Sequence, residues 1–190
     1  MKPVDFAYER PVALEDALTL LAQPGARVLA GGQSLGPMLN LRLAQPALLV
    51  DITAIDALQV AWRENGALIF GACVTHTEIE DGDLPDVTNG VMAAVARDIA
   101  YRAVRNRGTI GGSLAHADPA ADWLTCLSAL GADVIAAGVA GERRIPVASF
   151  VGGAFETTLQ PGEMLRAVSV PALSANAQWG FYKFCRKEGD

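Results

Sequence analysis

The chain has 190 residues, 51% of them hydrophobic, and a net charge of −6 at pH 7, a size that suits one domain or two small lobes sharing a ligand. The acidic balance argues against nucleic acid as a partner, because a phosphate backbone attracts basic proteins. No window approaches about 18 uninterrupted apolar residues, so we expect no membrane span, and the first residues show no secretory signal.

In chain order, the first residues predict a small β/α unit. Apolar spacing predicts a helix over residues 12–22. A short strand over 27–30 leads into a glycine-rich loop, a short helix follows over 37–43, and an apolar strand over 47–52 completes the unit.

The pattern changes near residue 57, where short strands and turns begin. We expect strands over 58–61, 67–72 and 74–75, with Glu64-Asn65-Gly66 as a hairpin turn. The remaining expected elements are a helix over 90–99 capped by Thr88 or Asn89, a helix over 120–130 ended by Gly131, a hairpin of strands 134–137 and 143–146, a strand over 165–170 stopped by Pro171, and a strand over 179–185. That last strand is barely begun when the sequence stops, so we expect the front part of a longer polypeptide.

Two glycine-rich stretches are the main functional signal. They are Ala-Gly-Gly-Gln-Ser-Leu at 30–35 and Thr-Ile-Gly-Gly-Ser-Leu at 109–114. Paired glycines uncover backbone N–H groups and allow positive φ, so each stretch could form a loop that cradles phosphate without a lysine. Two such loops could hold the two phosphates of a dinucleotide. Tight turns without a ligand are the alternative, and the spacing does not decide between them.

Other nucleotide and nucleophile motifs are disfavoured. Neither stretch continues into the Gly-Lys-Ser/Thr of a Walker A loop, and the Rossmann G-x-G-x-x-G is absent. Residues 32–36 match the G-x-S-x-G of serine hydrolases, with Asp51, His76 and His116 as candidate partners of Ser34. That motif normally follows several strands of a sheet, whereas Ser34 follows one or two. We therefore do not favour a hydrolase.

Cysteines and basic residues give weaker indications. Cys73, Cys126 and Cys185 are widely spaced and odd in number, which suits reduced thiols in the cytoplasm. With only two histidines in addition, we expect no metal in this chain. One basic cluster is either a solvated helix face or a surface for an acidic partner or phosphate; it consists of Arg97, Arg102, Arg105 and Arg107.

The run 105–122, Arg-Asn-Arg-Gly-Thr-Ile-Gly-Gly-Ser-Leu-Ala-His-Ala-Asp-Pro-Ala-Ala-Asp, closely resembles the FAD-binding medium subunit of the molybdenum hydroxylases. That family includes aerobic carbon monoxide dehydrogenase, xanthine dehydrogenase and 4-hydroxybenzoyl-CoA reductase. The stretch 30–35 resembles the family's other flavin loop, and residues 6–11 and 183–190 resemble its sequences too. The resemblance covers essentially the whole chain.

The resemblance implies an α+β fold with two lobes, of the PCMH (vanillyl-alcohol-oxidase-like) FAD-binding type. Residues 1–56 would form a small β/α lobe, and 57–176 a larger lobe with a mainly antiparallel sheet. Residues 177–190 would begin a C-terminal domain whose remainder is missing.

FAD would lie between the lobes, with backbone N–H groups of 30–34 and 111–113 on its diphosphate and the Thr109 and Ser113 hydroxyls beside them. Asp122 would bond the cofactor's polar chain and Lys183 would lie near the isoalloxazine. Ile99 and Leu165 would flank the adenine, although both could be plain core residues; Asp122 could merely favour a helix start, and Lys183 could be solvated. The residues expected to contact FAD are Val28, Leu29, Ala30, Gly31, Gly32, Gln33, Ser34, Leu35, Ile99, Thr109, Ile110, Gly111, Gly112, Ser113, His116, Asp118, Asp122, Leu165 and Lys183.

The function implied by the resemblance is electron transfer within a heterotrimer. Electrons would leave a large molybdopterin-binding subunit, pass through the 2Fe–2S clusters of a small subunit to the FAD of this chain, and reach an external acceptor. No catalytic side chain is expected, and the cysteine pattern gives no reason to expect the extra iron–sulfur cluster of the 4-hydroxybenzoyl-CoA reductase branch. The alternatives are a stand-alone flavin oxidase or reductase, and a non-catalytic module with empty glycine turns.

Overall fold

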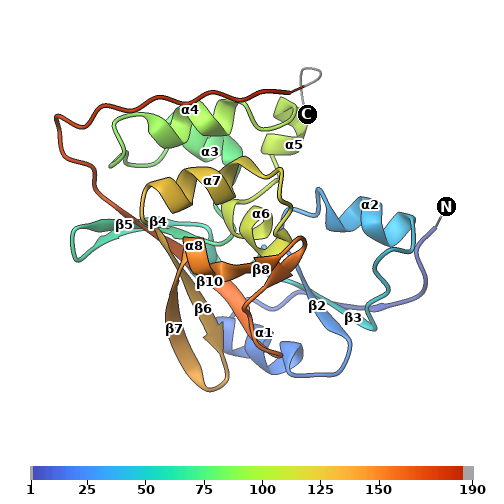
Figure 1. Cartoon of the computed structure of the whole chain (residues 1–190). Coiled ribbons are helices and arrows are strands. Elements are labelled where there is room, and N and C mark those ends of the chain that lie inside the picture. Colours follow the sequence, from blue (N-terminus) through green and yellow to red (C-terminus); the bar gives the residue numbers. More distant parts are fainter. Residues whose placement is uncertain (1, 186–190) are drawn as a thin grey trace.

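A computed structural model describes residues 2–185, which form a small lobe and a larger lobe (Figure 1). The small lobe holds a three-stranded parallel sheet in the order β1-β3-β2. Its elements are β1 (Ala7–Glu9), α1 (Leu14–Leu21), β2 (Ala26–Leu29), α2 (Leu35–Asn40) and β3 (Leu48–Asp51). The expected β/α lobe is thereby confirmed, including the helix expected over 12–22.

The larger lobe is built on a five-stranded antiparallel sheet in the order β4-β5-β10-β6-β7. Its strands are β4 (Ala61–Glu64), β5 (Ala67–Gly71), β6 (Asp133–Gly138), β7 (Gly141–Pro146) and β10 (Met164–Pro171). The first hairpin turns at Asn65 and Gly66, whose φ angles of 49° and 81° match the twist of the strands. The expected antiparallel sheet is confirmed, and β10 is its central strand.

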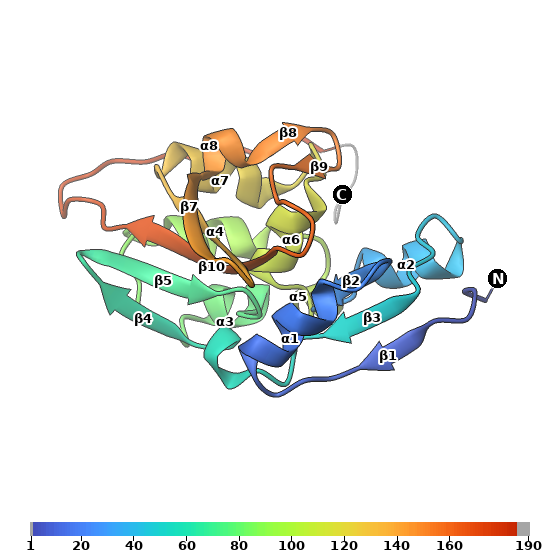
Figure 2. The same ribbon diagram turned by 90° about the horizontal axis from the view of Figure 1, so that it is seen from below.

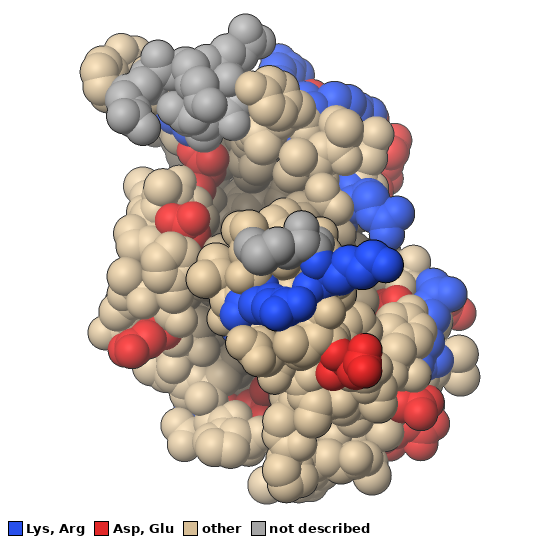
Figure 3. Space-filling model, turned by 90° about the vertical axis from the view of Figure 1, so that its right-hand side faces the viewer, with Lys and Arg blue, Asp and Glu red and all other residues tan. Residues whose placement is uncertain are grey.

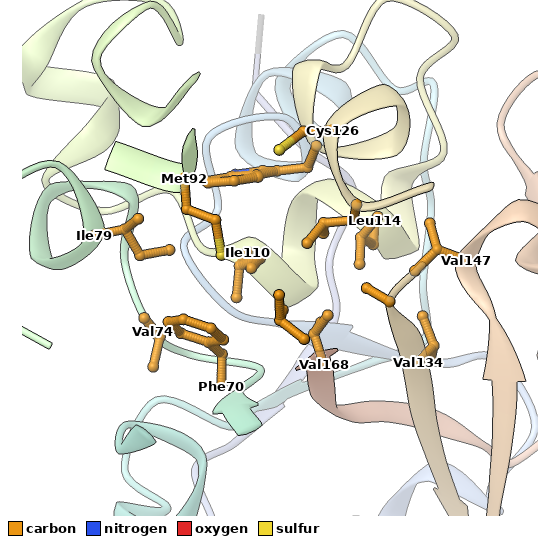
Figure 4. Packing of buried hydrophobic residues seen from close by; sticks show 14 of the residues in the cluster. Phe70, Val74, Ile79, Met92, Ile110, Leu114, Cys126, Val134, Val147 and Val168 are labelled. Atoms are coloured by element: carbon orange, nitrogen blue, oxygen red, sulfur yellow. The ribbon is translucent and has the colours of Figure 1, made fainter. Parts of the chain in front are cut away.

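Helices cover one face of this sheet (Figure 1). They are α3 (His76–Asp81), α4 (Val91–Arg97), α6 (Ile110–His116), α7 (Asp122–Ala129) and α8 (Val147–Phe150), while the short α5 (Arg102–Arg105) packs against α3. Their apolar side chains meet the sheet in one buried cluster, where Phe70 and Val168 lie below Met92 and Leu114 (Figure 4). Burial of this apolar area is the main stabilising contribution to the larger lobe.

A second buried cluster joins the two lobes. Leu18 and Leu21 of α1 pack with Val50 of β3, and Cys73 and Met164 from the larger lobe belong to the same cluster. Figure 2 shows the small lobe set beside the five-stranded sheet. Because this contact is apolar and close-packed, it fixes how the lobes lie relative to one another.

Two expected strands are wrong. Residues 58–61 were expected to be extended, but η1 (Asp56–Leu58) is a 3-10 helix and β4 begins later, at Ala61. Residues 179–185 form no strand because the segment 172–185 runs along α4 rather than along a sheet edge (Figure 1). The backbone N–H of Leu173 and the Trp179 Nε1–H donate there to the carbonyls of Val87 and Asn89, each at 2.9 Å.

The remaining differences are small elements. Residues 74–75 pair as an isolated bridge between Thr75 and Thr109 rather than as a strand. The hairpin of β8 (Val151–Gly153) and β9 (Glu156–Thr157) was not expected. The division into 1–56, 57–176 and 177–190 stays a prediction, and 186–190 lie outside the described residues.

No helix in the described part of the chain is long and apolar enough to cross a membrane.

Candidate functional site

A cavity of about 550 Å³ lies between the lobes and is lined by both glycine-rich stretches. Figure 3 views the molecule from the side of the small lobe, where the surface is hollowed. Ligand pockets of this size commonly form between two packed units of a fold. The cavity is therefore the candidate site.

The first glycine stretch presents open hydrogen-bond donors. It follows β2, turns at Gly32 with φ of 70°, and enters α2 with Ser34 as the N-terminal cap. Within residues 2–185, the backbone N–H groups of Gly31, Gly32, Gln33 and Ser34 donate to no protein acceptor. Converging backbone donors of this kind fit an anionic ligand.

The second glycine stretch is built differently from the expected loop. It opens helix α6, so neither Gly111 nor Gly112 has a positive φ. The N–H of Gly111 donates to Ala72 O at 3.1 Å, that of Gly112 to Thr109 Oγ1 at 3.0 Å, and that of Ser113 to Thr109 O at 3.0 Å. The expectation of a second open loop is wrong, because the Gly111 N–H bonds the segment that follows β5 and the N–H groups of Gly112 and Ser113 bond Thr109 at the start of α6. Thr109 and Ser113 offer the cavity hydroxyl groups instead.

Glycine in the second stretch serves close packing. A Cβ on Gly111 would lie 2.6 Å from the Ala72 Cβ, so α6 approaches the end of β5 more closely than any larger residue allows. Gly31 plays the same part between the stretches, since its Cβ would lie 2.8 Å from the Arg107 carbonyl carbon and 2.9 Å from Gly108 Cα. The two stretches thus meet in one wall of the cavity.

A charged group lies at another part of the cavity wall. Lys183 Nζ is 2.9 Å from Asp122 Oδ2 and 3.0 Å from Asp98 O. The Lys183 and Asp122 side chains are 18% and 12% exposed, so Lys183 is not a solvated strand residue. This ion pair joins the segment 172–185 to the first residue of α7.

Comparisons with known proteins agree with this architecture. Residues 4–173 match the family described as "FAD binding domain in molybdopterin dehydrogenase". The chain belongs to this family.

Relatives and solved structures extend the match. The chain is 40% identical to the 6-hydroxypseudooxynicotine dehydrogenase complex subunit alpha of Paenarthrobacter nicotinovorans, over 100% of this chain and 65% of that protein. It is 36% identical to the carbon monoxide dehydrogenase medium chain of Hydrogenophaga pseudoflava, over 100% of this chain and 67% of the relative.

The structure of that carbon monoxide dehydrogenase, which lacks the Mo-pyranopterin moiety, superposes with a TM-score of 0.95 at 36% identity, over 100% of this chain and 67% of the other. The structure of quinoline 2-oxidoreductase from Pseudomonas putida 86 superposes with a TM-score of 0.94 at 38% identity, over 100% of this chain and 66% of the other. The chain thus spans about two thirds of the length of these proteins.

Most residues predicted for this FAD-binding domain lie together. Leu29 and Ile110 do not line the cavity: Leu29 packs in a small cluster with Leu39, and Ile110 is fully buried in the main core. Leu165 belongs to that core and also reaches the cavity, beside a register shift in β10. The predicted residues that line the cavity are Val28, Ala30, Gly31, Gly32, Gln33, Ser34, Leu35, Ile99, Thr109, Gly111, Gly112, Ser113, His116, Asp118, Asp122, Leu165 and Lys183.

Sequence reasoning missed His76 as a lining residue. It begins α3, is 4% exposed, and its Nδ1 accepts a hydrogen bond from Trp123 Nε1 at 3.1 Å. Burial, and then the charge of Arg105, lowers the pKa of His76 to about 4. The available signal was the capping box of Thr75 and Glu78, which fixes the helix start just before the imidazole.

The basic cluster and the serine motif have other roles. Arg105 is buried and pairs with Glu80 at 2.7 Å, so it belongs neither to a solvated face nor to a free surface. Arg102 also pairs with Glu80, at 3.0 Å, but its side chain is 46% exposed. The candidate partners of Ser34 are engaged elsewhere: Asp51 accepts from Tyr8 and Thr53, His76 from Trp123, and the ring of His116 lies 5.2 Å from that of Phe155.

Two of the three thiols lie in the interior, whereas Cys185 is exposed. Cys73 and Cys126 are buried, which raises the pKa of each to about 12. No group of three or more potential metal ligands gathers within residues 2–185.

Proposed function

We propose that the chain holds FAD in the cavity between its lobes and serves as the electron-transfer subunit of a molybdenum-containing dehydrogenase. The observation that carries this proposal is the wall shared by the two glycine stretches, where open backbone donors face the cavity. An FAD diphosphate needs such donors.

The proposed roles of the residues follow from their positions. The N–H groups of 31–34 and the hydroxyls of Thr109 and Ser113 would hold the diphosphate. Asp122 would bond the polar chain of FAD and Lys183 would lie near the isoalloxazine, with Ile99 and Leu165 beside the adenine. When bound, FAD supplies the redox chemistry; the protein binds it, orients it and limits access of water.

Partners are proposed from the relatives. Their names describe medium chains or subunits of dehydrogenases for carbon monoxide, caffeine and glyceraldehyde. We infer a large molybdopterin-binding subunit and a small subunit with 2Fe–2S clusters, acting in the cytoplasm, with this chain passing electrons from those clusters to an external acceptor. The substrate would be chosen in the large subunit.

A visible spectrum tests the proposal. The purified chain should show flavin absorbance, or acquire it when FAD is added and excess removed. A chain that neither carries nor takes up FAD contradicts the proposal. Rapid reduction of the isolated flavoprotein by NAD(P)H would instead favour a stand-alone flavin reductase.

A further inference from the structure

The buried imidazole of His76 has a defined tautomer. Its Nδ1 lies 3.1 Å from Trp123 Nε1, and the Trp123 side chain is fully buried. An indole N–H can only donate, so Nδ1 is the acceptor and carries no proton. The neutral ring then carries its proton on Nε2.

The Nε2 edge of the ring faces the place where the glycine stretches meet. A Cβ on Gly108 would lie 2.9 Å from both Cδ2 and Nε2 of His76, and Gly108 is the residue that abuts Gly31. His76 also lines the cavity. The His76 ring and the first stretch therefore both adjoin Gly108, in the same wall of the cavity.

This donor lacks a protein partner. Across residues 2–185, no hydrogen bond from Nε2 is formed, and His76 as a whole is 4% exposed. Nε2 is not among the fully buried polar atoms that lack a partner, so this nitrogen reaches the accessible space of the cavity, where a ligand can accept its hydrogen bond. The charge that contributes to the lowered pKa of His76 is that of Arg105, which is itself paired with Glu80.

We propose that His76 donates its Nε2–H to the diphosphate of FAD, with Trp123 fixing the tautomer that makes this donor available. The proposal rests on the proposed function and adds to it a side-chain ligand held rigidly from the core of the larger lobe. His76 is thus a binding residue, and Trp123 is a positioning residue.

The decisive comparison is between two flavins. FAD and riboflavin share the isoalloxazine, but riboflavin has no phosphate. Titration with each, followed by flavin fluorescence, should show that His76→Phe weakens FAD binding roughly ten- to hundredfold, the range for a hydrogen bond to a charged group. Riboflavin binding should be unchanged.

Trp123→Phe is the matched comparison, because it removes the hydrogen bond that fixes the tautomer but leaves the imidazole in place, so the ring can still present Nε2–H. It should weaken FAD binding far less than His76→Phe, and His76→Gln, which retains an N–H donor, should recover part of the loss. Equal losses in His76→Phe and Trp123→Phe would mean that the pair is only structural and would overturn the proposal.

Nitrogen NMR of the wild-type chain gives a test that does not depend on variants folding. With ¹⁵N-labelled histidine, the spectrum should report the Nε2–H tautomer of His76, and the Nε2 resonance should move on addition of FAD but not of riboflavin. An Nδ1–H tautomer, or an Nε2 resonance unmoved at FAD saturation, contradicts this inference alone. A wild-type chain that binds no FAD overturns the proposed function as well.

Discussion

At the scale of single residues, Gly31 shows how closely the two glycine stretches meet. In Gly31→Ala the new Cβ would overlap the backbone of Arg107 and Gly108, which cannot move as a side chain can. We expect a destabilisation of roughly 1–3 kcal/mol, typical of overpacking, together with weaker FAD binding. Urea unfolding and FAD titration measure the two effects.

The control is a glycine from the same segment. Gly36 lies in α2, and a Cβ there meets no heavy atom within 4 Å. Gly36→Ala should leave stability unchanged or raise it by about 0.5–1 kcal/mol, because alanine favours a helix. Similar losses in both variants would show that the segment tolerates no side chain for another reason.

His76 also predicts a pH dependence of stability. Its pKa is about 4 in the fold and 6.5 as the ordinary value, so the unfolded chain takes up the proton first as the pH falls. The contribution of the neutral His76 ring to the free energy of unfolding is fully present above pH 6.5. It decreases as the pH falls from 6.5 to 4, by roughly 3 kcal/mol in total. Free energies of unfolding, measured from pH 6.5 to 4, should show the wild type losing stability relative to His76→Gln as the pH falls. A difference between the two that stays constant over this range would contradict the lowered pKa of His76.

At the scale of elements, an ion pair between α3 and α5 supports one wall of the cavity. Arg105 donates to both carboxylate oxygens of Glu80, at 2.7 and 3.1 Å, and its Nη1 donates to the carbonyls of Ile99 and Ala100 at 2.9 and 3.0 Å. Ile99 and Ala100 line the cavity, and Ala100 holds a φ of 43°. The pair thus fixes a backbone conformation that alanine rarely adopts.

Replacing Glu80 therefore tests an element contact. Glu80→Gln leaves the buried Arg105 without its charged partner and should destabilise the chain by roughly 3 kcal/mol. Glu64→Gln makes the same exchange in the exposed pair with Arg144, whose side chains are 41% and 46% exposed, and should cost under about 1 kcal/mol. Thermal unfolding compares the two variants; equal effects would mean that the pair on α3 is as weak as a surface pair.

The elements that could be predicted from sequence are those with their own periodic pattern. Helices α1, α4 and α7 and the β6–β7 hairpin each carry enough apolar spacing and turn residues to be recognised. Helix α6 was hidden because its first turn holds two glycines, which are poor helix formers, and tertiary packing on Ala72 overrides that propensity.

Contacts between distant elements could not be predicted. The cavity position of His76 depends on a hydrogen bond to Trp123, 47 residues away in the chain, and no local pattern reports such a pairing. The segment over 179–185 has the composition of a strand, yet it lacks a neighbouring strand and lies along α4. The glycine stretches were found correctly, although only one of them is an open loop.

At the scale of the whole molecule, the apolar cluster shared by both lobes predicts one cooperative unfolding transition. Trp62, Trp123 and Trp179 all follow residue 57, so tryptophan fluorescence reports the larger lobe, whereas far-UV circular dichroism reports the whole chain. The two signals should change together. FAD at 100 times its Kd should add about 2.7 kcal/mol, which raises the Tm by roughly 5–10 °C for a chain of this size. If the dichroism showed an earlier step that FAD did not move, the small lobe would unfold independently, and the cavity could not be a site that both lobes hold in common.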